Sequence, residues 1–316
     1  MNLQQLEYII AIDKYRHFVK AAEACFVTQA TLSMMIKKLE EELEVKIFDR
    51  SKQPVVPTDI GEKIILQAKI TLQHAQKIKE LINEEQDKIS GELRIGIIPT
   101  LAPYLLPLFL PSYLKNYPLV KIQISELTTE EIVQRLERNE IDAGILATPL
   151  ENKILIEKPL FYEQFVVYAS KEEQFRNKKY LLAEDIDVNR LWLLEEGHCL
   201  RSQVINLCEL KSKEKEVHQL DFAAASIETL KKIVEINNGI TIIPCLALAD
   251  MTKKQMQNIH HFKSPAPVRE IGLVTYRHFI KEKLLLSLEN EILKAIPDEM
   301  KTATKKEVLK VTLKDN

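Results

Sequence analysis

Cys199 and Cys208 are the residues of this sequence whose type and spacing best support chemistry, and they lie nine positions apart. The apolar residues between them recur at helical spacing, which predicts a short helix that carries both thiols. Nine residues of helix rise about 13 Å and turn the two thiols to opposite sides, whereas a disulfide needs α-carbons within about 7 Å. The segment is therefore either a helix with two free thiols or a remodelled loop with a disulfide, which makes it a candidate redox switch.

Composition limits the class of protein. The chain has 316 residues, 46% of them hydrophobic and 28% charged, which is enough for two or three ordinary domains. A formal net charge of -2 means that any nucleic-acid binding must come from a local surface. The sequence shows no signal-peptide pattern and no apolar run of about 18 residues, so we expect a cytoplasmic protein with no membrane partner. Thiols in that compartment are reduced at rest, so a pair that oxidises is a sensor or a catalyst.

The first 58 residues predict three short helices followed by a hairpin. Apolar spacing indicates helices over residues 3–13 and from Phe18 to Cys25, and Thr28 is a suitable N-cap for a third helix. The inner face of this third helix is expected to carry Leu32, Ile36, Leu39 and Leu43. Residues 45–57 then predict a strand-like hairpin beside it, which is the arrangement of a winged helix-turn-helix.

A long helical pattern covers residues 58–89 and ends at Ser90-Gly91. Its apolar residues follow a heptad-like spacing, namely Ile65, Ala68, Leu72, Ala75, Ile82 and Ile89. A single helix of this length has no core of its own to bury that stripe. We therefore expect a homodimer that pairs through residues 59–90, with a homotetramer as the larger assembly. Packing of the stripe within one chain is the alternative.

From residue 91 onward, buried strands alternate with helices. Strands are predicted over residues 93–98, 120–125 and 141–147, with helices over 103–117 and 128–139 between them. This βαβαβ order predicts a parallel sheet with ligands at its carboxyl edge. A second set surrounds the switch helix, with a further helix from Ser226 and strands over 165–169, 191–194, 216–222 and 240–243. A strand over 271–276 and a helix from about Ile280 are expected to return to the first set.

The N-terminal motifs resemble the DNA-binding domain of LysR-type transcriptional regulators. The resemblance rests on Ala21-Ala22, Val27-Thr28-Gln29, Thr31-Leu32-Ser33, the run from Ile36 to Leu43, Phe48-Asp49-Arg50 and Thr58 through Gly61. In helix-turn-helix proteins of this kind the third helix enters the major groove, and the wing touches the DNA backbone or the minor groove. The resemblance implies a double-stranded DNA operator as partner, contacted by Thr28, Gln29, Thr31, Leu32, Ser33, Lys37, Lys38, Arg50, Lys52 and Pro54.

Two α/β lobes with a cleft between them resemble the effector-binding domain of the same family, which is itself similar to periplasmic binding proteins. We therefore expect an α/β fold with a winged helix-turn-helix over residues 1–58, a linker and dimerisation helix over 59–90, a two-lobed regulatory domain over 91–300 and a tail over 301–316. Lobe I is expected over about 91–163 and 265–300, and lobe II over about 164–264.

The cysteine segment resembles that of the hydrogen peroxide sensors within this family. The matching residues are Arg94-Ile95-Gly96, Ile98-Pro99-Thr100, Leu194 through Arg201 with Cys208, and Gly239-Ile240-Thr241. The resemblance implies that peroxide oxidises Cys199 to a sulfenic acid and that Cys208 resolves it to a disulfide, which remodels the regulatory domain and the oligomer. It places Thr100, Thr129, His198, Arg201, Ser202 and Arg269 in the peroxide pocket. The first turn of a helix, beside His198 and Arg201, is also expected to lower the pKa of the Cys199 thiol.

Other interpretations stay open. The protein can be a LysR-type regulator that binds a small metabolite between the lobes and has incidental thiols. It can also be a thiol peroxidase, although the predicted helix-turn-helix argues against an enzyme. Thr100 and Thr129 can simply cap helices, and Arg269 can form a surface ion pair. His198, Cys199, Cys208 and His218 are candidate metal ligands, but their spacing fits no usual zinc site, so we expect no bound metal. We also expect no cofactor and no enzymatic activity.

Overall fold

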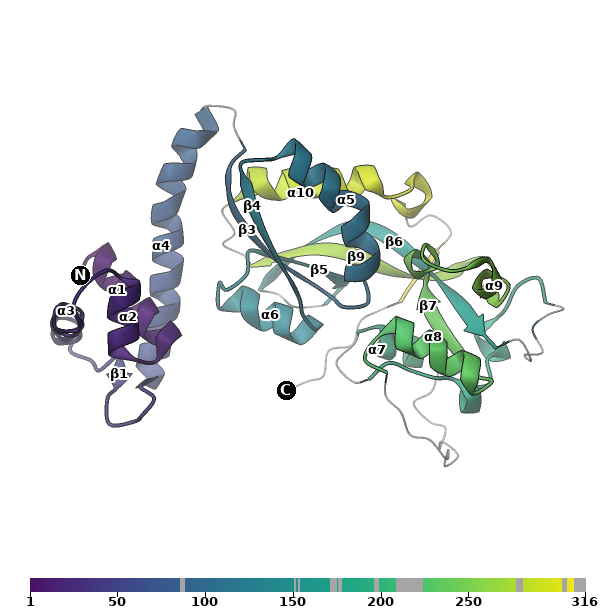
Figure 1. The fold of residues 1–316 in the computed structure, drawn as a ribbon, viewed down its shortest axis with the longest axis horizontal. Coiled ribbons are helices and arrows are strands. Elements are labelled where there is room, and N and C mark those ends of the chain that lie inside the picture. Colours follow the sequence, from purple (N-terminus) through teal and green to yellow (C-terminus); the bar gives the residue numbers. More distant parts are fainter. Residues whose placement is uncertain are drawn as a thin grey trace. The chain divides into compact units, whose positions relative to one another are not determined.

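The computed structural model of the chain contains two compact units, Met1–Lys88 and Ile89–Asn316, which are drawn in Figure 1. It describes residues 1–85, 89–150, 152, 154–170, 175, 178–195, 199–208, 224–276, 281–302 and 306–309. One buried apolar cluster forms the core of the first unit, and two clusters form the cores of the second.

The first unit is a helix-turn-helix with a short wing, as predicted. It comprises α1 (Leu3–Tyr15), α2 (Phe18–Ala24), α3 (Gln29–Glu42), β1 (Phe48–Asp49), β2 (Val56–Pro57) and α4 (Asp59–Glu85). Thr28 caps α3, since its hydroxyl accepts a hydrogen bond from the Thr31 amide at 3.2 Å. β1 and β2 pair antiparallel and form the wing. Leu32, Ile36 and Leu39 of α3 are fully buried in the core of this unit.

The apolar stripe of α4 begins inside this core, which corrects the expectation that no core within the chain buries it. Ile65 and Ala68 are each 3% exposed, because α1 packs along this part of α4. The first part of the stripe therefore stabilises the helix-turn-helix itself. Elsewhere on α4, Leu66 is 38% and Ile78 is 65% exposed. Pairing of residues 59–90 between subunits stays a prediction.

The second unit is built on an eight-stranded mixed sheet whose central order is β4-β3-β5-β9-β6-β7. The strands are β3 (Gly91–Ile97), β4 (Val120–Glu126), β5 (Ala143–Thr148), β6 (Leu155–Ala169), β7 (Ile240–Pro244), β8 (Ile259–His261), β9 (Ala266–Tyr276) and β10 (Lys306–Val308). β3 is parallel to both β4 and β5, as the predicted βαβαβ order requires. β9 is antiparallel to β5 and β6, and β10 runs parallel to the first residues of β9.

The helices of this unit form two groups, which define two lobes. Lobe I consists of β3, β4 and β5 with α5 (Ala102–Asn116), α6 (Thr129–Glu137) and α10 (Glu282–Ala295). Lobe II consists of β7, β8 and the end of β6 with α7 (Cys199–Leu207), α8 (Ile227–Ile236) and α9 (Lys253–Met256). The long strand β6 runs from one lobe into the other, as Figure 1 shows. Short 3-10 turns occupy Ala183–Asp185, Val188–Arg190, Cys245–Leu248 and Asp298–Met300.

Two side chains belong to the core of the lobe opposite to their own helix. Tyr104, on α5 of lobe I, packs in the apolar cluster of lobe II, and its hydroxyl donates to a carboxylate oxygen of Glu228 on α8 at 3.0 Å. Cys199, on α7 of lobe II, packs in the apolar cluster of lobe I. The first turns of α5 and α7 therefore hold the lobes together.

Some elements differ from the predicted ones. β6 begins at Leu155, ten residues before the predicted strand. The first part of β6 was not predicted because it mixes exposed with buried residues and lacks a continuous apolar run. The predicted strand over residues 191–194 is reduced to isolated bridges at Leu191 and Leu194. The predicted strand over 216–222 lies outside the described residues. Among the described helices, none combines the length and the apolar character needed to cross a membrane.

Candidate functional site

The two predicted cysteines lie at the two ends of α7, and both are free thiols. Cys199 is the first residue of the helix. The amide of Cys208 donates to the Val204 carbonyl at 3.1 Å, so the helical pattern continues up to the second thiol. An unbroken helix of this length separates its ends by about 13 Å. The thiols are therefore too far apart to bond unless α7 is remodelled.

The Cys199 side chain is only 7% exposed and lies against lobe I. Burial raises the pKa of this thiol, while the Arg269 cation, the Thr129 hydroxyl and two backbone amides lower it in part. The net direction is upward, so the expected lowering of the Cys199 pKa is wrong. A nearby cation does not offset the loss of water around a fully enclosed sulfur.

Arg201 and Ser202 bond to the backbone around the start of α7. The Arg201 guanidinium donates to the Leu194 carbonyl at 2.8 Å, and the Ser202 hydroxyl donates to the Cys199 carbonyl at 2.9 Å. Both side chains therefore hold this turn of the helix in place. His198 lies outside the described residues, so its place beside Cys199 stays a prediction.

Arg269 of β9 is the centre of a buried polar network. Arg269 and Glu163 of β6 are both fully buried, and Arg269 Nε donates to Glu163 Oε2 at 2.8 Å. The two terminal nitrogens of the guanidinium donate to the hydroxyl and the carbonyl of Thr100, at 3.0 and 3.2 Å. The other carboxylate oxygen of Glu163 accepts from the Leu246 amide at 2.8 Å. The interpretation of Arg269 as a surface ion pair is therefore wrong.

Thr100 and Thr129 lie just before α5 and at the start of α6. The Thr100 hydroxyl accepts from Arg269, and α5 has no side-chain cap. α6 is capped by Thr128, whose hydroxyl accepts from the backbone, and not by Thr129. The helix-cap interpretation is therefore wrong for both residues. Among the described residues, the buried Thr129 hydroxyl has no hydrogen-bond partner, and it lies close enough to the Cys199 thiol to lower the pKa of that thiol in part.

Sequence reasoning did not include Glu163, which orients Arg269. The available signal was a charged residue two positions before the apolar run 165–169, where a buried strand is expected. Cys245 packs against the lobe I cluster, and burial together with Glu163 raises its pKa to about 12. Burial also raises the pKa of Cys208 to about 11. Both of these thiols are therefore protonated at neutral pH.

The predicted DNA-contacting residues are accessible with one exception. On α3 and its cap the exposed or partly exposed residues are Thr28, Gln29, Thr31, Ser33, Lys37 and Lys38, and the wing exposes Arg50, Lys52 and Pro54. Leu32 is fully buried because it packs in the core of the first unit. Its prediction as a DNA contact is therefore wrong, and its role is to hold α3 on the domain.

Arg50 connects the wing to α3. Its guanidinium donates to Glu40 at 3.0 Å and lies over the Phe18 ring, 5.0 Å from the centroid. Glu40 is buried and also accepts from the amides of Ile47 and Phe48. The first carboxylate of the acidic run that follows Lys38 therefore points into the fold and away from any phosphate.

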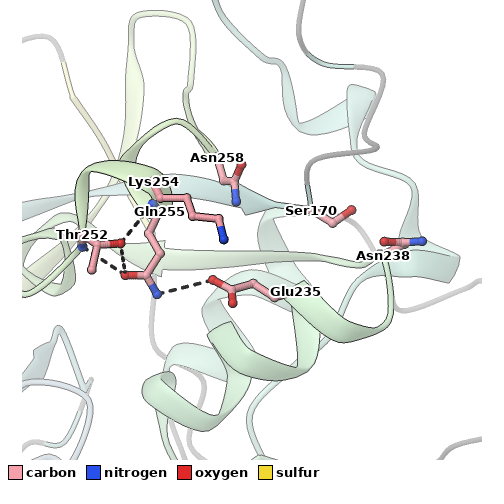
Figure 2. Close-up of a pocket in the computed structure, with 7 residues that line it drawn as sticks. All are labelled: Ser170, Glu235, Asn238, Thr252, Lys254, Gln255 and Asn258. Carbon is pink, nitrogen blue, oxygen red and sulfur yellow. Dashed lines mark hydrogen bonds between the residues drawn. The ribbon is translucent and has the colours of Figure 1, made fainter.

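A separate hollow of about 540 Å³ opens on lobe II and is shown in Figure 2. It is lined by Ser170, Glu235, Asn238, Thr252, Lys254, Gln255 and Asn258. Gln255 donates to Glu235 at 3.4 Å, and the Tyr168 hydroxyl donates to the same carboxylate. None of the predicted site residues lines this hollow, which belongs to lobe II alone.

Two protein-family models match the chain. The model described as a bacterial regulatory helix-turn-helix protein of the lysR family matches residues 3–62. The model described as the LysR substrate binding domain matches residues 86–284. The two matches fall on the helix-turn-helix and on the two-lobed part of the chain.

Individual proteins are similar over most of the chain. The DNA-binding transcriptional dual regulator OxyR of Escherichia coli K12 is 35% identical over 274 residues, which cover 87% of this chain and 89% of that protein. The structure of a full-length OxyR variant from Pseudomonas aeruginosa has a TM-score of 0.76 at 32% identity and covers 93% of this chain and 98% of that one. A hydrogen peroxide-bound mutant of OxyR from Corynebacterium glutamicum has a TM-score of 0.60 at 28% identity, with 93% and 92% covered.

Proposed function

Since the chain belongs to the LysR family of bacterial regulatory helix-turn-helix proteins, we propose that it is a hydrogen peroxide-responsive transcription regulator. The observation that carries the proposal is the position of Cys199, a thiol enclosed between two lobes beside the Thr129 hydroxyl and the Arg269 cation. The similarity to OxyR proteins, one of them with hydrogen peroxide bound, supports the same ligand here. The relatives are regulators by name, so the proposal is a sensor and not an enzyme.

Hydrogen peroxide reacts with Cys199 in one two-electron step. The thiol loses its proton, the sulfur attacks one peroxide oxygen, the O–O bond breaks, and the departing hydroxide takes up a proton and leaves as water. Cys199 becomes a sulfenic acid. Negative charge develops on the departing oxygen, which needs hydrogen-bond donors. The Thr129 hydroxyl is one such donor, and the Thr100 hydroxyl is another because it only accepts from Arg269 and keeps its own proton to donate.

Cys208 then resolves the sulfenic acid. Its sulfur attacks the oxidised sulfur of Cys199, a disulfide forms, and the hydroxyl leaves with the Cys208 proton as water. The bond requires that α7 unwind, and it constrains the remodelled segment by about 3 kcal/mol of chain entropy. This value is similar to the coupling free energies of about 1 to 3 kcal/mol that typical allosteric proteins use. Withdrawal of Cys199 from the core of lobe I is the event that remodels the regulatory domain and the oligomer.

The partner of the first unit is a double-stranded DNA operator. The accessible side chains of α3, among them Gln29 and Ser33, contact base edges in the major groove. The basic residues Lys37 and Lys38 contact phosphates, and the wing residues contact the DNA backbone. The inward direction of Glu40 supports this arrangement, because it removes one negative charge from the surface that faces the DNA.

The proposed assembly is a homodimer that pairs through residues 59–90, with a homotetramer as the larger form. The exposed Leu66 and Ile78 on α4 support such pairing, since apolar side chains on a long helix are covered in a stable assembly. Two helix-turn-helix units then bind two half-sites of one operator. The regulator acts in the cytoplasm, where DNA and reduced thiols occur together.

The test is treatment of the reduced protein with one equivalent of hydrogen peroxide, followed by thiol counting by mass spectrometry and measurement of operator binding. We expect Cys199 and Cys208 to lose their free thiols and the DNA affinity to change. Cys199→Ser is expected to abolish the response and retain DNA binding, whereas Cys25→Ser, in the first unit, is expected to respond normally. A Cys199→Ser protein with a normal response contradicts the proposal.

Two further outcomes separate the alternatives. A small metabolite that changes DNA affinity without any change in thiol count favours a metabolite-binding LysR-type regulator. Sustained consumption of peroxide in the presence of a thiol reductant, far beyond one equivalent per site, favours a thiol peroxidase.

A further inference from the structure

We propose that residues 306–309 form a strap that holds the cysteine-bearing face of α7, and that Gln203 is the positioning residue through which the strap acts. The strap consists of β10 and Leu309. The inference rests on the proposed function, because it concerns the step in which Cys199 and Cys208 join. It assigns a role to the C-terminal segment, for which the sequence motifs suggest none.

The strap is attached to the strand that carries Arg269. Residues 306–308 pair in parallel with residues 266–268 of β9, and the Leu309 amide donates to the Val268 carbonyl at 2.9 Å. The Leu309 side chain is buried in the apolar cluster of lobe II. Because Arg269 directly follows Val268, the strap is attached next to the buried polar network around Arg269.

Gln203 connects the strap to α7. Its side chain is 0% exposed, and its Nε2 donates to the Leu309 carbonyl at 3.1 Å. Gln203 follows Cys199 by four residues, which places the two side chains on the same face of the helix, one turn apart. Among the described residues, Gln203 Oε1 has no hydrogen-bond partner. The bond to Leu309 therefore satisfies only the amide nitrogen of Gln203, and its loss leaves that buried donor unpaired as well.

This connection opposes the second chemical step and not the first. Sulfenic acid formation needs only the thiol, the peroxide and the donors around them, all with α7 intact. Disulfide formation joins the sulfenic sulfur of Cys199 to the sulfur of Cys208 with loss of water, and the intact helix keeps these atoms apart. Unwinding of the turn between Cys199 and Gln203 breaks the bond from Gln203 to Leu309. The strap therefore sets how readily an oxidised Cys199 proceeds to the disulfide.

The first test separates the two chemical steps. Sulfenic acid formation is measured with hydrogen peroxide in a Cys208→Ser background, and disulfide formation is measured in the protein with both cysteines by rapid quenching and mass spectrometry. Gln203→Leu, which keeps the volume of the side chain and removes its donor, is expected to speed disulfide formation about tenfold and to change sulfenic acid formation less than about twofold. A chain that ends at Thr302 is expected to behave like Gln203→Leu, and a chain that ends at Thr312 like the full-length protein.

The second test needs no peroxide. In the reduced protein, amide hydrogen exchange over residues 201–207 is expected to rise about tenfold in Gln203→Leu, with no change in α6. If the full-length protein forms no sulfenic acid or disulfide and the exchange nevertheless responds, the proposed function fails and the strap stands. Unchanged exchange in α7, or an equal change in the rates of both chemical steps, overturns the strap.

Discussion

The Arg269 guanidinium donates to the Thr100 hydroxyl at 3.0 Å, and both side chains are buried. The bond joins β9 to the turn before α5 and leaves the hydrogen of the Thr100 hydroxyl free to donate. Glu163 forms a salt bridge with the same guanidinium, so the cation is already paired within the protein. In the proposed peroxide site, Arg269 is therefore expected to act mainly by orienting Thr100 and by its electrostatic field at Cys199.

Thr129→Val tests the hydroxyl that faces Cys199. Valine has the same shape and lacks the donor, so sulfenic acid formation is expected to slow about a hundredfold. The free energy of unfolding is expected to stay the same or to rise slightly, because a buried hydroxyl with no other partner is removed. Peroxide kinetics in the Cys208→Ser background and urea unfolding measure the two quantities. Thr129→Ser is the control and should restore the rate; a loss of stability that parallels the loss of rate contradicts the assignment.

Arg269→Met tests the buried ion pair. The substitution leaves the Glu163 carboxylate charged and unpaired in the core, so the free energy of unfolding is expected to fall by about 3 to 5 kcal/mol. Urea unfolding of the reduced protein measures the change. Combining Arg269→Met with Glu163→Gln removes the uncompensated charge and is expected to recover much of the loss. Equal stability of Arg269→Met and the unsubstituted protein refutes the assignment.

The raised pKa of Cys199 predicts a rate that increases with pH. A pKa above the ordinary thiol value of about 8.5 makes the thiolate the minor form at pH 7, and each pH unit toward the pKa increases that form about tenfold. Sulfenic acid formation in the Cys208→Ser background is therefore expected to accelerate from pH 7 to pH 9. A rate that is already constant below pH 7 shows that the thiol pKa is lowered after all.

Cys208 and Cys245 predict how stability changes at high pH. Their pKa values are raised to about 11 and about 12 in the folded protein, above the value of about 8.5 for an unfolded thiol. The contribution of these thiols to stability is fully present below pH 8.5 and is lost as the pH rises toward 11 and 12, because the unfolded chain ionises first. Urea unfolding from pH 7 to pH 10 measures the decrease, and Cys245→Ala is expected to make it smaller.

Substitutions on α4 distinguish its buried apolar stripe from the apolar side chains that α4 exposes. Ile65→Ala removes a side chain from the core of the first unit and is expected to lower its stability by about 2 to 4 kcal/mol. Ile78→Asp is expected to leave the fold intact and to weaken the homodimer. Thermal unfolding and analytical ultracentrifugation separate the two effects. An unchanged oligomer in Ile78→Asp at low protein concentration contradicts pairing at this position.

Gln29 and Leu32 are neighbours on α3 with different predicted roles. Gln29→Ala is expected to weaken operator binding by about 1 to 3 kcal/mol and to leave thermal stability unchanged, because its side chain is exposed. Leu32→Ala is expected to destabilise the first unit, because its side chain fills the core. Operator binding at a temperature where both variants are folded, together with thermal unfolding, checks the contrast. Similar effects of the two substitutions on stability rule it out.

Periodicity predicted those elements whose burial is regular. The helix between the two cysteines and the βαβαβ run follow from spacing that tertiary structure does not override. The first part of β6 escaped notice because it carries exposed residues between buried ones and lacks a continuous apolar run. The burial of Ile65 was also missed, since a heptad-like stripe does not indicate whether a second subunit or a helix of the same chain covers it.

The environment of the thiol was harder to predict than its position. Spacing located Cys199 at the start of a helix, where a low pKa is common. The pKa of Cys199 is raised instead, because the thiol is inserted into the core of lobe I. This insertion depends on how the two lobes meet, which the local sequence does not indicate. The role of Glu163 depends on the same contact between distant strands.

Tyr104 and Cys199 are each enclosed by the lobe to which they do not belong. Neither lobe is then expected to fold as an independent domain, because each isolated lobe would lose a side chain that the other lobe contributes to its core. Displacement of the Cys199 sulfur would disturb the packing between the lobes, which is the effect that the proposed oxidation requires.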